Sequence, residues 1–317
     1  MKLNIFDKNI LAAIDKNCRM PFSDIGRTIK RSPQFIKYRF DKLHENKTIL
    51  HLYTAVDPAS LGYRELGYFI KMQGVELAQE QQLLDYFYKH SFITKIYRME
   101  GYYDYYLACC VQNLEEFSTF LNETYGRYGP FFIKFDNVND LQSTYYDKNY
   151  LLGRKMETTL RNTQPLRQED RKILSSLVKN PRITLVQLGK EHNISIETAR
   201  LSLERIQKSI SRLSFIMNPK EIYHHLIFIK LKQYSQEEEK KVQQFCNINQ
   251  NITEYTRSYG TWDLRLHVEI EDREQFRQLL REIKFLFEKN ILTIEYCYIF
   301  AIDKYRSIPI EYPFQEQ

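Results

Sequence analysis

The segment Asp7-Lys8-Asn9-Ile10-Leu11 returns later in the chain as Asp170-Arg171-Lys172-Ile173-Leu174, 163 residues further on. Further pairs at this offset are Lys16-Asn17 and Lys179-Asn180, Arg19 and Arg182, Ile25-Gly26 and Leu188-Gly189, and Ser32 and Ser195. At a slightly shorter offset of 159, Gly101-Tyr102-Tyr103-Asp104 matches Gly260-Thr261-Trp262-Asp263. Ordered matches with a drifting offset indicate duplication of a two-domain unit, because this period is far too long for a solenoid repeat.

The first part of each unit is predicted to be helical. Apolar residues follow helical spacing over residues 6–16, and residues 22–29 form a second short helix. A third helix begins at Ser32-Pro33, since serine is a good N-cap and proline a good first helical residue, and it runs to about Glu45. Residues 49–56 predict a short hairpin or wing. Three short helices followed by a wing are typical of a winged helix-turn-helix domain.

The second part of each unit changes to a mixed pattern of strands and helices. The order strand–helix–strand–strand–helix–strand is the ferredoxin-like arrangement. The expected elements are 66–72, 77–89, 93–99, 103–111, 114–125 and 131–138 in the first copy, and 225–232, 237–247, 253–258, 262–270, 273–287 and 292–302 in the second.

The predicted fold class is therefore α+β, with two winged helix-turn-helix domains alternating with two ferredoxin-like βαββαβ domains. Residues 144–166 are polar and charged, and we interpret them as a linker with some helix. The predicted domains are a first helix-turn-helix at 1–58, a first α/β domain at 62–143, a second helix-turn-helix at 167–219 and a second α/β domain at 222–306.

The bulk composition describes an ordinary globular protein with a mild basic excess. The 317 residues include 46 Lys+Arg against 40 Asp+Glu, a net charge of +6, which permits an anionic partner without requiring one. Five cysteines without a CxxC pair argue against a disulfide framework or a zinc knuckle. The N-terminus has no apolar signal region and no stretch is apolar enough to span a membrane, so we expect a cytoplasmic protein.

The third helix of each unit decides whether the protein can bind DNA, because phosphates need cations and base edges need hydrogen-bonding groups. Residues 30–42 carry five basic residues against Asp41 alone, whereas residues 193–205 carry two of each sign. We expect the first head to be the main reader of double-stranded DNA and the second to be weak or degenerate. The candidate DNA contacts are Lys30, Arg31, Ser32, Gln34, Lys37, Tyr38, Arg39, Lys42, Arg200 and Arg205.

These motifs together resemble the Lrp/AsnC family of transcriptional regulators. The head motifs are Asp7-x-x-Ile10-Leu11, Ile25-Gly26, Ser32-Pro33, Ile49-Leu50 and Asp57-Pro58, and the turn Gly101-Tyr102-Tyr103-Asp104 resembles that of the family's α/β domain. The resemblance covers nearly the whole chain, twice. The usual glycine before the wing is missing, with Asn46-Lys47-Thr48 in its place, and the second turn has Trp262 where the first has tyrosine.

The resemblance implies a DNA-binding regulator that pairs through its α/β domains and responds to an amino acid or another small metabolite bound between them. The candidate effector contacts are Gly101, Tyr103, Asp104, Gly260, Trp262 and Asp263. For Asp104 and Asp263 we favour a structural role, in which each residue stands in a tight turn and its carboxylate bonds to backbone amides. Pairing could occur within the chain, as a pseudo-dimer, or between chains as a homo-oligomer.

An enzyme is the main alternative class. The sequence has no HExxH, P-loop, GxSxG or GxGxxG motif, so we expect no catalytic residue, metal site or cofactor. The sirohaem decarboxylases of haem biosynthesis nevertheless share this two-domain build, some as fused pairs, and His224, His225 and His267 could serve a tetrapyrrole. The cationic first helix and the Gly-x-Tyr-Asp turn favour the regulator. A third alternative is a metabolite sensor whose heads have lost DNA binding.

Overall fold

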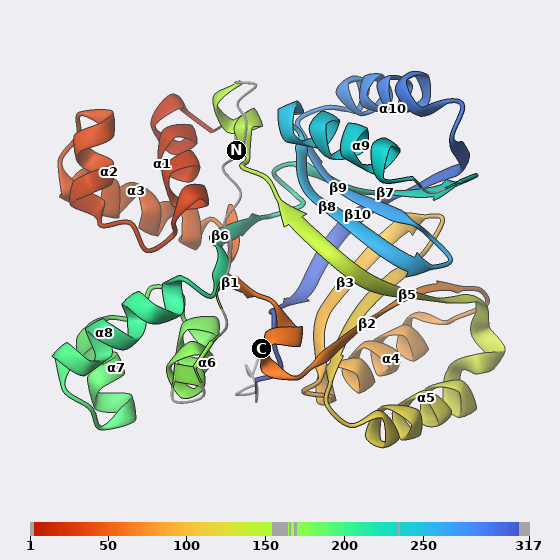
Figure 1. Ribbon diagram of the computed structural model, residues 1–317, viewed down its shortest axis with the longest axis horizontal. Helices are drawn as coiled ribbons and strands as arrows, with labels where there is room; N and C mark the ends of the chain where they lie inside the picture. Colours follow the sequence, from red (N-terminus) through yellow and green to blue (C-terminus); the bar gives the residue numbers. More distant parts are fainter. Residues whose placement is uncertain (1–2, 154–163, 165, 168–169, 234, 311–317) are drawn as a thin grey trace.

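The computed structural model describes residues 3–153, 164, 166–167, 170–233 and 235–310. Figure 1 shows two helical heads on one side of the molecule and a strand barrel flanked by helices on the other. The first head comprises α1 (Ile5–Lys16), α2 (Phe22–Ile29), α3 (Pro33–Glu45) and β1 (Ile49–Val56). The second head comprises α6 (Arg171–Lys179), α7 (Leu185–His192), α8 (Ile196–Gln207) and β6 (Ile210–Met217).

Each copy also contributes one half of the barrel. The first half contains β2 (Arg64–Met72), α4 (Leu77–Lys89), β3 (Ile93–Gly101), β4 (Tyr105–Val111), α5 (Leu114–Tyr128) and β5 (Phe132–Tyr145). The second contains β7 (Tyr223–Leu231), α9 (Gln236–Ile248), β8 (Ile252–Gly260), β9 (Leu264–Ile270), α10 (Arg273–Phe287) and β10 (Ile291–Tyr305). Short 3-10 helices are η1 (Pro58–Leu61), η2 (Gly129–Phe131) and η3 (Asn149–Leu152).

The tight turn between α2 and α3 follows from local sequence. Lys30 ends α2 in the left-handed region, with φ of 54°. Gly26 is required nearby, because a Cβ at this position would lie 2.5 Å from the carbonyl oxygen of Arg31. The Ser32 hydroxyl then accepts a hydrogen bond of 3.2 Å from the backbone N–H of Phe35, which caps α3 as the sequence predicts.

The two heads pack on each other and share one hydrophobic core. That core includes Ile10 and Ile36 from the first head and Leu174 and Leu188 from the second, all at most 1% exposed. Because each segment predicted as a wing supplies only one strand, its backbone needs an outside partner. The expected hairpin is therefore replaced by an antiparallel pair between β1 and β6, one strand from each copy.

A reciprocal pair of arginines strengthens this contact between heads. Arg19 donates to the carbonyl oxygen of Ile183 at 2.9 Å. Its counterpart Arg182 donates to the carbonyl oxygens of Cys18 and Met20. The same contact made in both directions is the signature of a two-fold interface, here formed within a single chain.

The two ferredoxin-like halves join edge to edge into a closed barrel, in the order β10-β3-β4-β2-β5-β8-β9-β7. Strand β5 pairs with β8 of the other copy, and β10 pairs with β3, so the eight described strands of the barrel close on themselves without a free edge. Helices α4 and α5 cover the outer face of the first half, and α9 and α10 cover that of the second (Figure 1). The predicted fold class is confirmed.

The structure differs from the expected linker over residues 144–166. Strand β5 continues to Tyr145 because its last residues pair with β8, and no pattern within one unit predicts that partner. Beyond it, Tyr146, Lys148, Tyr150 and Leu151 are buried against the barrel and the heads. Residues 154–163 and 165 of this segment lie outside the described part of the chain. Among the helices described, none is both long and apolar enough to span a membrane.

Candidate nucleic-acid interface and buried charged cluster

The outer face of α3 presents most of the predicted DNA contacts to solvent. Exposed side chains on this helix and the turn before it are Lys30, Arg31, Ser32, Gln34, Lys37 and Tyr38. Tyr38 is a large aromatic residue that remains 57% exposed. The heads lie on the side of the molecule away from α4, α5, α9 and α10, so these helices do not cover α3 (Figure 1).

The lysines of α3 form ion pairs on the surface of their own helix. The Lys37 ammonium lies 2.5 Å from a carboxylate oxygen of Asp41, and that of Lys42 lies 2.6 Å from Glu45. All four side chains are at least 43% exposed. Exposed pairs of this kind contribute about 0–1 kcal/mol, so a phosphate can replace either carboxylate at little cost.

Arg39 has a different position, since it faces α1. Its guanidinium lies 2.6 Å from the carboxylate of Asp7, which is fully buried and also forms the capping box of α1. In the second head Ser202 occupies the position equivalent to Arg39, and Arg205, one turn later, reaches Asp170 at 2.8 Å. Each of these arginines joins two helices of its head, and the contact with DNA expected of both stays a prediction.

The exposed face of α8 is electrically balanced. The Arg200 guanidinium lies between two carboxylates of the same helix, 2.6 Å from Glu197 and 2.9 Å from Glu204. All three side chains are about half exposed. A phosphate approaching Arg200 would therefore meet two negative charges at the same time.

The two Gly-x-x-Asp turns mark the places where the copies touch. Gly101 and Gly260 have φ of 124° and 132°, a region that favours glycine. A Cβ on Gly101 would lie 2.8 Å from the carbonyl oxygen of Tyr296, and one on Gly260 would lie 2.5 Å from that of Asn137. Both carbonyls belong to the other copy, so these glycines permit the close approach of the two halves.

The aspartates of the turns have the structural role that we favoured. One oxygen of Asp104 accepts from the backbone N–H of Met72 at 2.8 Å, and the other accepts from Lys71 at 2.6 Å. Asp263 accepts in the same way from the N–H of Leu231 and from Lys230. Each carboxylate thus ties its turn to the neighbouring strand, and the effector role stays a prediction.

Tyr103 and Trp262, which occupy equivalent positions of the two copies, meet inside the barrel. The indole N–H of Trp262 donates to the hydroxyl of Tyr103 at 2.8 Å, and that hydroxyl donates to Asp136. The two side chains are at most 3% exposed. They lie at the contact between the halves rather than on a solvent-facing rim.

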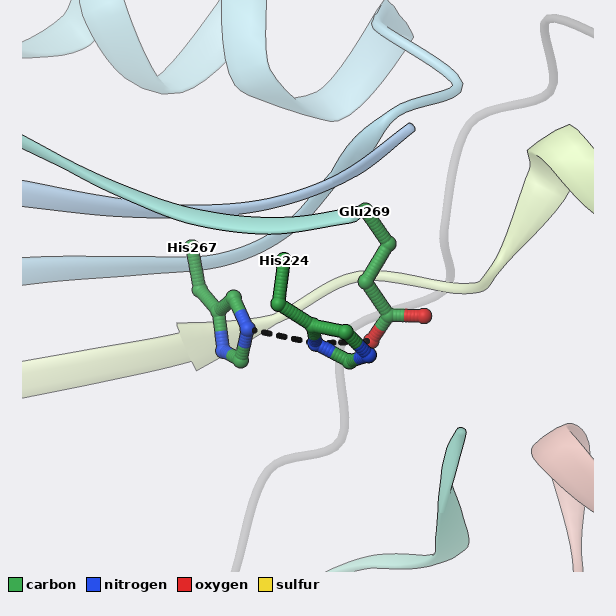
Figure 2. A group of neighbouring side chains, drawn as sticks. All are labelled: His224, His267 and Glu269. Carbon is green, nitrogen blue, oxygen red and sulfur yellow. Dashed lines mark hydrogen bonds and ion pairs between the residues drawn. The ribbon is translucent and has the colours of Figure 1, made fainter. Parts of the chain in front are cut away.

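A second group of charged side chains lies buried between the barrel and the heads. Figure 2 shows His224, on β7, with His267 and Glu269, on β9, side by side. The Nδ1 atom of His224 is 3.0 Å from Nε2 of His267 and 4.0 Å from Oε1 of Glu269. Lys148 also donates to Oε1, and the Tyr150 hydroxyl donates to Oε2 at 2.5 Å.

Burial and charge together set the ionisation of this cluster. Burial lowers the pKa of His224 to about 4, although the Glu269 charge opposes this shift. Burial also raises the pKa of Glu269, but the nearby Lys148 and the two histidines outweigh it and lower that pKa to about 2. At neutral pH the cluster therefore contains a neutral His224 and an ionised carboxylate.

Sequence reasoning found only part of this cluster. It named His224 and His267 but not Glu269, although residues two apart on a strand share a face. Nothing in the sequence around Lys148 indicates that it would be buried, because the surrounding segment is polar and was interpreted as a linker. A small cavity of about 10 Å³ adjoins the cluster and is lined in part by Lys148, His267, Glu269 and Tyr305.

The duplicated heads and the joined ferredoxin-like halves define the class of protein: a tandem duplication, in one chain, of a unit made of a helix-turn-helix head and a ferredoxin-like half. The chain is similar in sequence to known transcriptional regulators of the helix-turn-helix type. The chain is 26% identical over 157 residues to the HTH-type transcriptional regulator Ptr1 of Methanocaldococcus jannaschii, a match covering 49% of this chain and 98% of Ptr1. It is 25% identical over 120 residues to the regulator FL11 of Pyrococcus furiosus, covering 38% of this chain and 78% of FL11.

The whole duplicated fold also has a solved counterpart. The crystal structure of the siroheme decarboxylase NirDL superposes with a TM-score of 0.59 over 96% of this chain and 94% of that one. The two sequences are only 14% identical, so this likeness concerns the fold alone. No protein-family model matches the chain.

Proposed function

We propose that this chain is a sequence-specific DNA-binding transcriptional regulator of Lrp/AsnC type, with the first head as its main reader of duplex DNA. The observation that supports this proposal most strongly is the exposed, positively charged face of α3, the helix that Ser32 caps in the first helix-turn-helix. A helix of this kind enters the major groove with its first residues near the base edges. Similarity to two regulators supports the same function.

The proposed contacts divide into two groups. Lys30, Arg31, Lys37 and Lys42 neutralise phosphates, which provides affinity and salt dependence. Ser32, Gln34 and Tyr38 stand near the start of α3, where side chains reach bases or the adjoining backbone. Arg39 acts mainly through Asp7, by fixing the angle between α3 and α1.

The second head is proposed to add weak contacts only. Arg200 must leave Glu197 and Glu204 before it can bind a phosphate, and both carboxylates would remain close to the DNA. Arg205 is engaged by the buried Asp170. Because the heads share a core, the second head fixes the orientation of the first even where it makes no contact of its own.

We further propose that the two kinds of domain have different roles. Residues 1–58 and 167–219 form the DNA-binding module, and residues 62–143 and 222–306 form the assembly module that joins them. A small metabolite such as an amino acid would act on the assembly module near Gly101 and Gly260, and association of whole chains through its outer surface would extend the pseudo-dimer.

A sirohaem-decarboxylase-like enzyme is the second candidate. The whole-chain likeness in fold to NirDL and the buried His224 and His267 favour it. The cavity beside these histidines, about 10 Å³, opposes it, because pockets for ligands of drug size enclose roughly 300–1,000 Å³. Sirohaem added to the pure protein would be decarboxylated by the enzyme and left unchanged by the regulator.

The regulator proposal is tested by selection of genomic DNA fragments on the purified full chain, with and without a panel of amino acids. We expect enrichment of a limited set of duplexes, and a shift in that set or its affinity with one of the amino acids. Recovery of fragments without sequence preference, even at low salt, would refute sequence-specific regulation.

A further inference from the structure

The cluster of His224, His267 and Glu269 has the donor atoms and the spacing of a metal site. One nitrogen from each histidine and one carboxylate oxygen all lie within 4.8 Å of one another. Around a tetrahedral ion with bonds of about 2.0–2.1 Å, ligand atoms stand about 3.3 Å apart. The two distances from His224 Nδ1, 3.0 and 4.0 Å, bracket that value.

We propose that His224, His267 and Glu269 bind a divalent transition-metal ion of the Zn²⁺ type, one per chain. Imidazole nitrogen and carboxylate oxygen together suit Zn²⁺ and its neighbours better than Mg²⁺ or Ca²⁺, which take oxygen ligands. The side chains come from adjacent strands of one sheet, so their backbones are held rigidly. This proposal does not depend on whether the protein binds DNA.

The cavity beside the cluster supplies room for a fourth ligand. Its volume of about 10 Å³ is close to the smallest space that holds one water molecule, and its lining includes His267 and Glu269. Three protein ligands and one water are typical of zinc sites with an exchangeable position.

The surroundings of Glu269 orient its ligand atom. The Tyr150 hydroxyl fixes Oε2 at 2.5 Å, which leaves Oε1 directed towards His224. Lys148 donates to that same Oε1 and is 5% exposed. The Lys148 ammonium thus competes with the metal ion for Oε1 of Glu269, and the ion binds by displacing this ammonium.

Lys148 also connects this cluster to the first head. Its backbone N–H donates to the buried carboxylate of Asp15, on α1, at 2.8 Å. Arg212 and Ser214 of β6 bind the same carboxylate at 2.7 and 2.5 Å. Release of Lys148 from Glu269 therefore takes place beside the residues that hold α1 against the second head.

Only the second copy carries these ligands. At the offset of 159 the first copy has Glu65, Ala108 and Cys110 in their places. Glu65 forms an ion pair with Lys95 at 3.0 Å instead. The expected stoichiometry is therefore one ion per chain rather than two.

The test uses the intact purified chain, with Co²⁺ as an optical probe and Zn²⁺ measured by elemental analysis after dialysis. We expect a visible cobalt band, about one bound Zn²⁺ per chain, and no near-ultraviolet thiolate–cobalt band, because the five cysteines take no part. His224→Gln and His267→Gln should each weaken binding at least tenfold. Lys148→Met should strengthen it about tenfold, because the competing cation is gone.

His225→Gln is the matched control, since the His225 ring stacks on Phe276 of α10 at 3.8 Å, on the opposite face of β7. It should bind Zn²⁺ like the unchanged protein. Absence of the visible band from both the unchanged protein and Lys148→Met would overturn the proposal, as would equal losses in His225→Gln and His224→Gln or a thiolate band. If the His224 variant does not fold, the Lys148→Met comparison decides.

Discussion

Trp262 donates its indole N–H to the hydroxyl of Tyr103 at 2.8 Å, and these two residues occupy the same position in the two copies. A homodimer would place two identical side chains here. The duplicated chain has instead acquired a donor and an acceptor, which pair across the pseudo-two-fold axis inside the barrel. At this contact the two copies therefore differ in sequence and in hydrogen-bonding role.

Replacing Trp262 by phenylalanine should lower the free energy of unfolding by about 1–3 kcal/mol, because the Tyr103 hydroxyl stays buried with one partner fewer. The measurement is urea unfolding, with Tyr103→Phe and the double variant completing a cycle. We expect the double variant to lose less than the sum of the two single losses. Strict additivity would show that the two side chains are not coupled.

Replacing Arg39 by alanine should destabilise the protein by about 2–4 kcal/mol, since it leaves the carboxylate of Asp7 buried without its cation. The value lies below that of a fully buried pair because the Arg39 side chain is 22% exposed. Lys37→Ala, on the same helix, is the control and should change stability by less than about 0.5 kcal/mol. Equal stability of the two variants in thermal or urea unfolding would contradict this account.

The contribution of Lys304 to the stability of the protein should rise with pH between about 8 and 10. Burial, together with the charge of Arg306, lowers the pKa of Lys304 to about 8. In this window the unfolded lysine binds a proton that the folded one has lost, so raising the pH favours the folded state, by about 1–2 kcal/mol. Unfolding in urea at several pH values measures the slope. Burial raises the pKa of the five cysteine thiols, which opposes the effect of Lys304 in this window, so the quantity to compare is the difference in stability between the unchanged protein and Lys304→Met. This difference should change with pH in the direction given, and a constant difference would contradict the assignment to Lys304.

Replacing Gly101 by alanine should disturb the join between β3 and β10, because the new Cβ would meet the carbonyl oxygen of Tyr296 at 2.8 Å and φ is 124°. We expect a loss of about 1–3 kcal/mol in unfolding free energy. Gly126→Ala, at a helical glycine with open space around its Cβ position, is the control and should be neutral or slightly stabilising. If Gly101→Ala left the unfolding free energy unchanged, the claim that glycine is required here for the close approach of β3 and β10 would be contradicted.

Features set by local sequence were predictable, and those set by pairing between copies were not. The cap at Ser32 and the order of strands and helices follow from residues close in sequence. The β1–β6 pair, the β5–β8 join and the burial of Lys148 depend on where the second copy lies. The ion pair of Arg205 with Asp170 was also not predictable from the repeat. It corresponds to the pair of Arg39 with Asp7, but Arg205 lies one helical turn beyond the position equivalent to Arg39.

The central claim, that α3 of the first head reads duplex DNA, is tested most directly by comparing Lys37→Ala with Arg200→Ala. Fluorescence anisotropy on a selected duplex, repeated at several salt concentrations, gives both affinity and its salt dependence. We expect Lys37→Ala to weaken binding several-fold and to reduce the slope of log K against log salt by about 1, while Arg200→Ala leaves both nearly unchanged. Equal losses in the two variants, or no binding by the unchanged protein in dilute buffer, would contradict the account.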